Sequence, residues 1–297
     1  MTPYRLTPAE SDAVVRYQHG QRHGHVESVF IKFNLPDARA LWLKFTILKR
    51  KDPRADAVVE AWGIAFNLGP PGGERVALKS TFPINEAQIE RTCFFLKVGD
   101  IEWSHGGSRG ALRSSDGGQE IRWDLSFRTD PHGFRHLPAA WMYRGSIPKS
   151  KATSPQVDTR FSGTVVVNGE TTQVVDAPGM LGHNWGACHA ESWTWAHCND
   201  WSDGSEVTFE AVTSKVKFGP ITMPLLTVCH LRMPGEWVTM NGLLRAFRIK
   251  SKPDGLAWRL SALNRSTHIE AAFSATPDRF SIFLSFQKKH FFGGILL

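Results

Sequence analysis

The residues best suited to chemistry are concentrated in one short stretch of the chain. Four of the eleven tryptophans lie between residues 185 and 201, mixed with histidine, asparagine, aspartate and cysteine. The stretch contains Gly182-His183-Asn184-Trp185-Gly186 and then Trp193-Thr194-Trp195-Ala196-His197-Cys198-Asn199. In an extended strand alternate side chains share a face, so Trp193, Trp195, His197 and Asn199 would lie together. A broad aromatic face with polar tips is typical of a pocket for a large apolar ligand.

The same pattern also fits an ordinary β core, because aromatic-rich strands are common there and their indole N–H groups find ordinary partners. Under the pocket interpretation we expect Trp193, Trp195 and His197 to face an apolar cavity, with Trp185 at or near its wall. The predicted ligand-binding residues are His183, Asn184, Trp185, Trp193, Trp195, His197 and Asn199.

Four carboxyl side chains near this stretch are candidate acids. A carboxylic acid that an apolar surround keeps protonated can deliver a proton at neutral pH. Tryptophan ring faces stabilise the cation that protonation of an alkene produces. For each carboxyl the alternative is a solvated side chain on a β surface. Glu210 carries a condition, because it alternates with Phe209 and would face solvent if Phe209 packs into the core. The candidates are Asp176, Glu191, Asp200 and Glu210.

His183 is either an acid or a residue that ties a turn, and the glycines on both sides favour a tight turn at residues 182–186. Cys188-His189 and His197-Cys198 lack the short repeated spacing of a structural zinc site. The chain has no nucleophile elbow, phosphate loop or dinucleotide fingerprint. We therefore expect neither a metal nor a cofactor.

The elements that position these residues are expected to be β-strands throughout. Gly99-Asp100 and Asn168-Gly169 predict two-residue hairpin turns. Short helices are expected only near residues 86–89 and 137–141. Runs rich in aromatic and β-branched residues predict strands at residues 29–33, 40–47, 58–66, 93–98, 101–103, 121–127, 164–171, 207–212, 225–231, 243–249, 257–263 and 280–286.

A polar segment with two prolines, residues 147–155, divides the chain into near-equal halves and is the expected seam between two β units. His25-Val26-Glu27-Ser28 and His189-Ala190-Glu191-Ser192 each precede a predicted strand, which fits two copies of one unit. The apolar end, residues 291–297, is expected to be a last strand or a tail that covers an edge. An open C-terminal edge would allow self-association.

The net charge of +7 invites a nucleic-acid interpretation, but the basic residues are dispersed and no recognition pattern accompanies them. We expect no nucleic-acid partner, and attraction to anionic lipid headgroups is a secondary option. Apolar runs are too short to cross a bilayer, and the first residues lack the layout of a signal peptide. The expected location is cytoplasmic, with peripheral membrane contact as an option.

Taken in order, the motifs resemble the lipocalin-like superfamily that contains tocopherol cyclase and carotenoid 1,2-hydratase. They are residues 150–155, Asn168-Gly169, residues 183–186 and residues 193–199. The resemblance implies two lipocalin-like antiparallel β-barrel or sandwich units packed together, at residues 1–150 and 151–297, with an elongated apolar cavity. The second unit would carry both tryptophan motifs. The family's chemistry is protonation of an isoprenoid alkene, followed by ring closure or capture of water.

Two functions remain open. One is a hydratase or cyclase, of the lyase or isomerase class, that acts on a long isoprenoid or polyene by alkene protonation in an apolar cavity. The other is a non-catalytic binding protein for a hydrophobic, lipid-like ligand. A carboxylic acid inside the cavity, beside the rings of Trp185, Trp193 or Trp195, would favour the enzyme. A third option is a cavity filled by side chains in a protein that scaffolds a partner.

Overall fold

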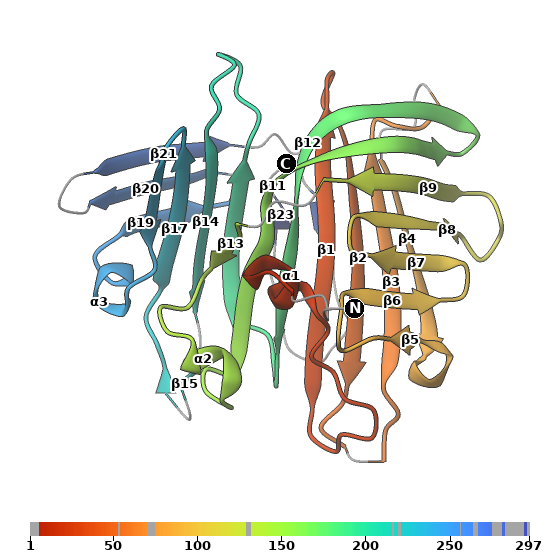
Figure 1. The fold of residues 1–297 in the computed structure, drawn as a ribbon, viewed down its shortest axis with the longest axis horizontal. Helices are drawn as coiled ribbons and strands as arrows, with labels where there is room; N and C mark the ends of the chain where they lie inside the picture. Colours follow the sequence, from red (N-terminus) through yellow and green to blue (C-terminus); the bar gives the residue numbers. More distant parts are fainter. Residues whose placement is uncertain are drawn as a thin grey trace, which may run out of the picture. The chain divides into compact units, whose positions relative to one another are not determined.

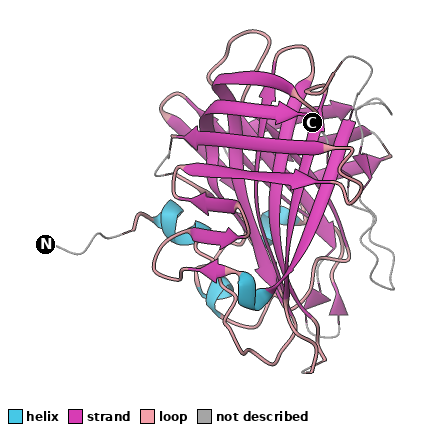
Figure 2. Ribbon diagram, turned by 90° about the vertical axis from the view of Figure 1, so that its right-hand side faces the viewer, coloured by secondary structure: helices cyan, strands magenta, loops and turns pink. Residues whose placement is uncertain are grey.

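The chain is almost entirely β in its computed structural model (Figures 1 and 2), which confirms the expected all-β fold class. The structure describes residues 6–52, 54–70, 75–128, 132–215, 217–218, 221–255, 257–263, 267–274, 281–282 and 294–295. Two compact units form. Unit 1 comprises Met1–Phe134 with Ala152–Cys188, and unit 2 comprises Arg135–Lys151 with His189–Leu297.

Unit 1 is built on one large antiparallel sheet with the strand order β4-β3-β2-β1-β12-β11-β9-β8-β7-β6-β5, while β10 pairs with β11. A short helix, α1 (Pro8–Ala13), and a 3₁₀ turn at Ile84–Glu86 accompany it. The strands are β1 (His25–Leu35), β2 (Arg39–Lys49), β3 (Val58–Phe66), β4 (Arg75–Pro83), β5 (Gln88–Ile89), β6 (Phe95–Val98), β7 (Ile101–Ser104), β8 (Gly107–Arg113), β9 (Glu120–Phe127), β10 (Phe134–Arg135), β11 (Ser150–Val167) and β12 (Glu170–Gly186).

The core of unit 1 follows from alternation along these strands. In β9 every second residue is buried, as expected of a strand with one face on a core. The alternate residues Val29, Ile31 and Phe33 of β1 belong to the same core as Trp103 and Trp123. The large sheet thus packs its inner side chains against one another.

The two predicted hairpin turns occur where expected. β6 and β7 pair around Gly99-Asp100, and β11 and β12 are joined at Asn168-Gly169. Both Asn168 (φ 49°) and Gly169 (φ 89°) lie in the left-handed region, which a two-residue type I′ turn requires and asparagine and glycine tolerate.

The long strand β12 returns alongside β1, with Val29 opposite His183 and Glu27 opposite Trp185. The expected tight turn at residues 182–186 is therefore wrong, because this stretch is the end of a continuous strand. Gly182 serves close packing instead: a Cβ there would lie 2.3 Å from Cζ of Phe30 on β1. The missing side chain makes room for that aromatic ring.

Unit 2 contains a sheet with the order β18-β17-β14-β13-β23-β22, a three-stranded sheet β19-β20-β21, and the pair β15-β16. Two one-turn helices, α2 (Trp141–Arg144) and α3 (Leu243–Ala246), complete its described part. The strands are β13 (Ser192–Cys198), β14 (Thr208–Lys215), β15 (Lys217–Phe218), β16 (Ile221–Thr222), β17 (Leu226–Met233), β18 (Glu236–Met240), β19 (Lys250–Asp254), β20 (Ala257–Leu263), β21 (His268–Ser274), β22 (Ser281–Ile282) and β23 (Gly294–Ile295). Its core includes Ala196, Phe209, Cys229 and Trp258.

The compact units do not follow the expected division into residues 1–150 and 151–297. Residues 152–188 join unit 1, because β12 hydrogen-bonds to β1 and β11 to β9. The expected seam at residues 147–155 is largely strand, since β11 begins at Ser150. As a result, the two tryptophan motifs that were expected together in the second unit belong to different units.

Two local expectations also change. Residues 243–249 were expected to be a strand, but α3 begins there after Gly242. The helix expected near residues 86–89 is a 3₁₀ turn followed by β5. The strand expected at 280–286 and the C-terminal segment 291–297 lie mostly outside the described residues. None of the described helices is long and apolar enough to cross a membrane.

Candidate functional site

Burial separates the four candidate acids. The side chain of Asp176 is 62% exposed and forms an ion pair with Arg128 at 2.8 Å. Glu191 and Asp200 are exposed as well. Glu210 is 0% exposed on the central strand β14. Of the four candidates, Glu210 is therefore the one that water does not reach.

The expectation that Glu210 faces solvent if Phe209 packs into the core is wrong. Phe209 packs into the core of unit 2, yet Glu210 on the opposite face of β14 is buried too. The expectation assumed a sheet with one solvated face, whereas both faces of β14 are covered at this point. An ionisable side chain that is buried on such a strand needs polar partners.

The partners of Glu210 come from neighbouring strands at the same register. His197 on β13 lies opposite Glu210, Glu210 lies opposite His230 on β17, and His230 lies opposite Thr239 on β18. Directly opposed residues share a face of an antiparallel sheet. A polar row thus crosses four strands on the face away from the apolar core of unit 2.

Three side chains contact or face the Glu210 carboxyl, and we call them with Glu210 the Glu210 cluster. Nε1–H of Trp195 donates a hydrogen bond of 2.9 Å to Oε1 of Glu210. Nε2 of His136 lies 3.5 Å from the same oxygen. His230 is 1% exposed, and its Nδ1 is 3.0 Å from Oγ1 of Thr239. The cluster is enclosed and rich in groups that can hold or pass a proton.

His230 is a neutral neighbour at physiological pH. Burial lowers the pKa of His230 to about 4, and a carboxylate charge on Glu210, which would raise this pKa, does not offset the effect of burial. A buried neutral imidazole keeps one N–H, so it can donate one hydrogen bond and accept another without adding a buried charge.

The predicted ligand-binding residues divide between the two units. Trp193, Trp195 and His197 share one face of β13, as predicted, because the strand pairs with β14 in unbroken register. That face is the one that carries Glu210, and the apolar core of unit 2 lies on the other. Asn199 is 7% exposed and directly follows β13. His183, Asn184 and Trp185 belong to unit 1.

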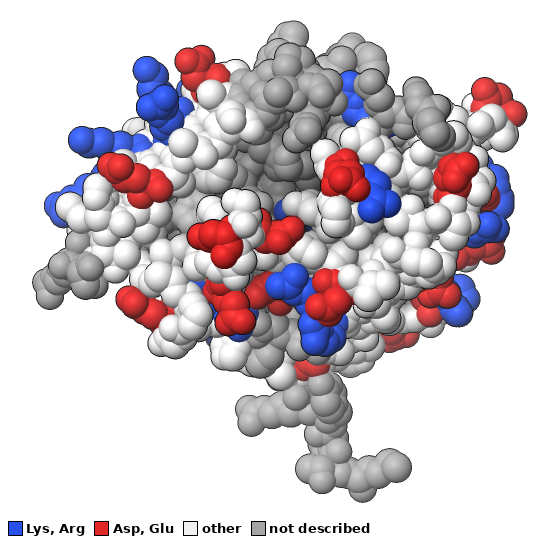
Figure 3. Space-filling view, turned by 90° about the horizontal axis from the view of Figure 1, so that it is seen from above, with Lys and Arg blue, Asp and Glu red and all other residues white. Residues whose placement is uncertain are grey.

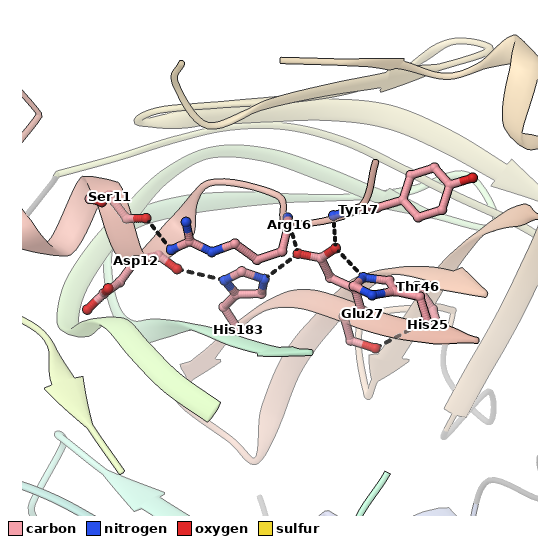
Figure 4. Close-up of polar contacts among 9 residues, drawn as sticks. Ser11, Asp12, Arg16, Tyr17, His25, Glu27, Thr46 and His183 are labelled. Carbon is pink, nitrogen blue, oxygen red and sulfur yellow. Dashed lines mark hydrogen bonds and ion pairs between the residues drawn. The ribbon is translucent and has the colours of Figure 1, made fainter. Parts of the chain in front are cut away.

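His183 takes part in a second polar cluster, in unit 1, which we call the Glu27 cluster (Figure 4). Both oxygens of the Glu27 carboxylate accept two hydrogen bonds each. Oε1 accepts from the backbone N–H of Arg16 (2.6 Å) and from Nε2 of His183 (2.8 Å). Oε2 accepts from the backbone N–H of Tyr17 (2.8 Å) and from Nε2 of His25 (2.8 Å). The carboxylate therefore fastens the segment after α1 to the sheet.

The geometry of His183 indicates that its ring is protonated on both nitrogens. Nδ1 lies 2.6 Å from the carbonyl oxygen of Asp12, and a carbonyl can only accept. Nε2 faces the Glu27 carboxylate, so it donates as well. An imidazolium beside a carboxylate, both buried, forms a charge-assisted hydrogen bond. The ring also stacks on Trp185, with centroids 4.5 Å apart.

Electrostatics make Glu27 a structural carboxylate rather than an acid. Burial alone would raise its pKa, but hydrogen bonds from His183 and His25, together with their positive charge, lower the pKa to about 2. A group that holds its proton only below that pH cannot supply one near neutrality. The Glu27 cluster therefore fixes the fold, and the Glu210 cluster is the candidate site for proton transfer.

Sequence reasoning missed four members of these clusters: His25, Glu27, His136 and His230. Glu27 left a signal, because a charged residue inside the apolar run from His25 to Phe33 must find buried partners. The sequence similarity between residues 25–28 and residues 189–192 does not extend to the surroundings of the two glutamates. Glu191 is exposed, while Glu27 is 1% exposed. His136 stands in a segment without a recognisable pattern, and His230 lies in the strand predicted at residues 225–231, where no motif marked it as a site residue.

The described residues contain no group of three or more His, Cys, Asp or Glu side chains arranged to hold a metal ion. A shallow depression of about 400 Å³ lies on unit 1, away from both clusters, and is lined in part by Asp100, Arg109, Arg122 and Asp124. Its lining also includes Gly110, Ala111, Trp123 and Val166.

The chain was compared with curated sequences and with solved structures. No curated protein is significantly similar to the chain in sequence. Among solved structures, it is similar to a candidate AttH protein from Nitrosomonas europaea (TM-score 0.49, 15% identity, 86% of this chain and 83% of that one). It is also similar to kievitone hydratase from Nectria haematococca (TM-score 0.47, 11% identity, 95% and 83%) and to CghA (TM-score 0.45, 12% identity, 86% and 74%).

The family comparison bears directly on the motifs. Residues 138–282 match the model of the family described as tocopherol cyclase-like. This region includes both tryptophan motifs and all four candidate acids. The match confirms that the chain is similar to the lipocalin-like superfamily of tocopherol cyclase and carotenoid 1,2-hydratase.

Proposed function

We propose that the protein is a hydratase or cyclase that protonates an alkene of a long isoprenoid or polyene, with Glu210 as the acid. At the level of the family, the tocopherol cyclase-like match supports a lipocalin-like hydratase or cyclase. The observation that carries the assignment of the acid is the complete burial of Glu210 beside the indole of Trp195. The other three candidate carboxyls are exposed.

An acid for this chemistry must hold its proton until an alkene arrives. Removing a carboxylate from water is costly, and a protonated carboxyl avoids that cost. The indole N–H of Trp195 suits this state, because it is a neutral donor to Oε1. His136, 3.5 Å from Oε1, is placed to return a proton after each turnover.

The proposed reaction balances without a cofactor. The Glu210 proton bonds to the less substituted alkene carbon through the π electron pair, which leaves a tertiary cation on the neighbouring carbon. A tryptophan ring face stabilises such a cation by about 0.5–2 kcal/mol. Water captures the cation and loses a proton in hydration, or an internal alkene or hydroxyl captures it with loss of a proton in ring closure. Either route returns one proton to the carboxylate.

The test uses geranylgeraniol, an acyclic isoprenoid with trisubstituted alkenes, in D₂O. Hydration adds one water and places one deuterium on carbon, whereas ring closure gives an isomer that carries one carbon-bound deuterium. We expect mass spectrometry to find one of these products with the native protein. Glu210→Gln should abolish the product, and the exposed Asp176→Asn serves as the matched control.

The outcomes separate enzyme from binder. A product that survives Glu210→Gln would exclude Glu210 as the acid. Tight binding of this probe by the native protein, without deuterium on carbon, would favour the alternative function, a non-catalytic binding protein for lipid-like ligands. Retention of activity by Asp176→Asn together with loss in Glu210→Gln would support the proposal.

A further inference from the structure

Two segments of unit 2 expose large apolar side chains. The first, residues 135–151, contains α2, with Trp141 63% exposed. The second, residues 241–252, contains α3, where Leu243 is 47%, Leu244 76% and Phe247 43% exposed. Single exposed apolar residues are ordinary, but a group of them on two short helices marks a surface that meets something apolar.

The same two segments carry charge of one sign. Each contains four Lys or Arg residues and neither Asp nor Glu, while the whole chain has a net charge of +7. Arg144, Arg245 and Arg248 are exposed beside the apolar side chains. On the face drawn in Figure 3, in contrast, Lys and Arg are mixed with Asp and Glu. The single sign in these segments favours an anionic partner.

The two segments are tied together by hydrogen bonds. Nδ2 of Asn241, just before α3, donates to the carbonyl oxygens of Arg135 (2.8 Å) and Leu137 (3.5 Å), just before α2. The hydroxyl of Tyr143 in α2 accepts from the backbone N–H of Leu137 at 2.7 Å. Both helices lie in the lower left part of Figure 1. The apolar and basic side chains are thus presented by a built surface rather than by loose loops.

We propose that residues 135–151 and 241–252 form a surface that docks on membranes containing anionic lipids. Apolar side chains next to arginines are typical of protein that lies in the headgroup region, where the apolar part enters the acyl boundary and the guanidinium groups contact phosphates. Helices of one turn are too short to enter further. This inference does not depend on Glu210 or on catalysis.

Charge complementarity selects this occupant over a second copy of the chain. Two copies facing each other through this surface would bring arginines against arginines, because the surface carries no acidic residue of its own. Anionic headgroups remove that repulsion. Each arginine near an anionic surface contributes about a fivefold gain in affinity at low salt.

The test is sedimentation with vesicles of phosphatidylcholine alone and with equimolar phosphatidylcholine and phosphatidylglycerol. We expect the protein to bind the anionic vesicles and to be released by salt. Leu244→Glu should reduce binding about tenfold or more, since it replaces the most exposed apolar side chain of the surface by an acid. Arg245→Gln should reduce it about fivefold.

The matched control is Val175→Glu, because Val175 is 79% exposed but belongs to unit 1. Equal losses for Leu244→Glu and Val175→Glu would overturn the proposal, since net charge alone would then explain them. Absence of binding to anionic vesicles would overturn it too. So would concentration-dependent dimerisation, seen by light scattering and lost in Leu244→Glu, because the surface would then be an interface between copies. Circular dichroism confirms that each variant is folded.

Discussion

Each unit buries a glutamate on its main sheet, and the two have contrasting partners. Glu27 is 1% exposed and accepts four hydrogen bonds, two from backbone N–H groups and two from histidines. Glu210 is 0% exposed and accepts from the neutral indole of Trp195, with a neutral His230 opposite on the next strand and Nε2 of His136 at 3.5 Å. Burial is the same in both, so burial alone does not assign a role.

The difference lies in which form of the carboxyl the surroundings support. Backbone N–H groups and protonated histidines favour a carboxylate, and they hold the pKa of Glu27 near 2. A neutral indole accommodates a carboxylic acid equally well. A pair of similar side chains whose environments differ in this way divides into a structural and a chemical member. The predictions below test that division, from the largest effect to the smallest.

Glu27→Gln should cause the largest loss of stability. The amide can accept from some of the four donors, but its NH₂ group meets others, and buried donors are then left without an acceptor. We expect about 3–5 kcal/mol less free energy of unfolding in urea, as for a broken buried ion pair. The control is Glu102→Gln, which removes an exposed ion pair with Arg109 and should cost less than about 1 kcal/mol. Equal losses in the two variants would contradict the structural role of Glu27.

Acid should abolish the contribution of Glu27 to the stability of the fold. Its pKa is about 2 in the folded protein against 4.5 as the ordinary value, so the unfolded chain binds the proton first as pH falls. The stabilisation is complete above about pH 4.5 and disappears as pH falls towards 2. Its size is about 3 kcal/mol. Urea titrations across this range should show the loss in the native protein and not in Glu27→Gln.

His230 should act in a higher pH window. Burial lowers its pKa from 6.5 to about 4, so between these pH values His230 is protonated in the unfolded chain but neutral in the folded protein. The neutral form therefore stabilises the fold above about pH 6.5, and this stabilisation falls as pH drops from 6.5 to 4. We expect at most about 3 kcal/mol. His230→Gln should remove this component and leave the loss below pH 4.5 intact, which unfolding curves at several pH values can resolve.

The strands were predictable because their signals are local. Alternation in β9 and the Asn168-Gly169 turn each depend on adjacent residues, and both are found as expected. The prediction of a strand at residues 243–249 was wrong for a local reason as well. Its buried positions, Ala246 and Ile249, are three residues apart, a helical spacing that a run of apolar letters hides.

The clusters were not predictable because their partners are distant in sequence. His183 and Glu27 are 156 residues apart, and only the pairing of β1 with β12 brings them together. The shared face of Trp193, Trp195 and His197 was predictable from alternation, whereas the presence of Glu210 on that face depends on the register between β13 and β14. Register across strands is set by tertiary packing and turns, which a single sequence does not specify here.

Trp195→Phe should have a moderate effect. The substitution keeps an aromatic ring at a site that is 6% exposed but removes the N–H that donates to Glu210. Loss of one neutral hydrogen bond to a buried acceptor costs about 1 kcal/mol, which thermal unfolding can measure. Trp103→Phe is the comparison, because Trp103 is equally enclosed in the core of unit 1. A loss of several kcal/mol at Trp195 beyond that at Trp103 would mean that its N–H stabilises a charged Glu210.

Glu210→Gln should have the smallest effect on stability, less than about 1 kcal/mol. Glutamine has nearly the same shape as a protonated glutamate, is neutral, and offers Oε1 to the indole N–H of Trp195 as glutamate does. The substitution is therefore a near-neutral exchange only if Glu210 carries its proton in the folded protein. A carboxylate that formed an ion pair with His136 would behave like Glu27, and its loss would cost several kcal/mol. Parallel urea unfolding of Glu27→Gln and Glu210→Gln distinguishes these states without any substrate, and similar losses in both would remove the physical basis for Glu210 as the acid.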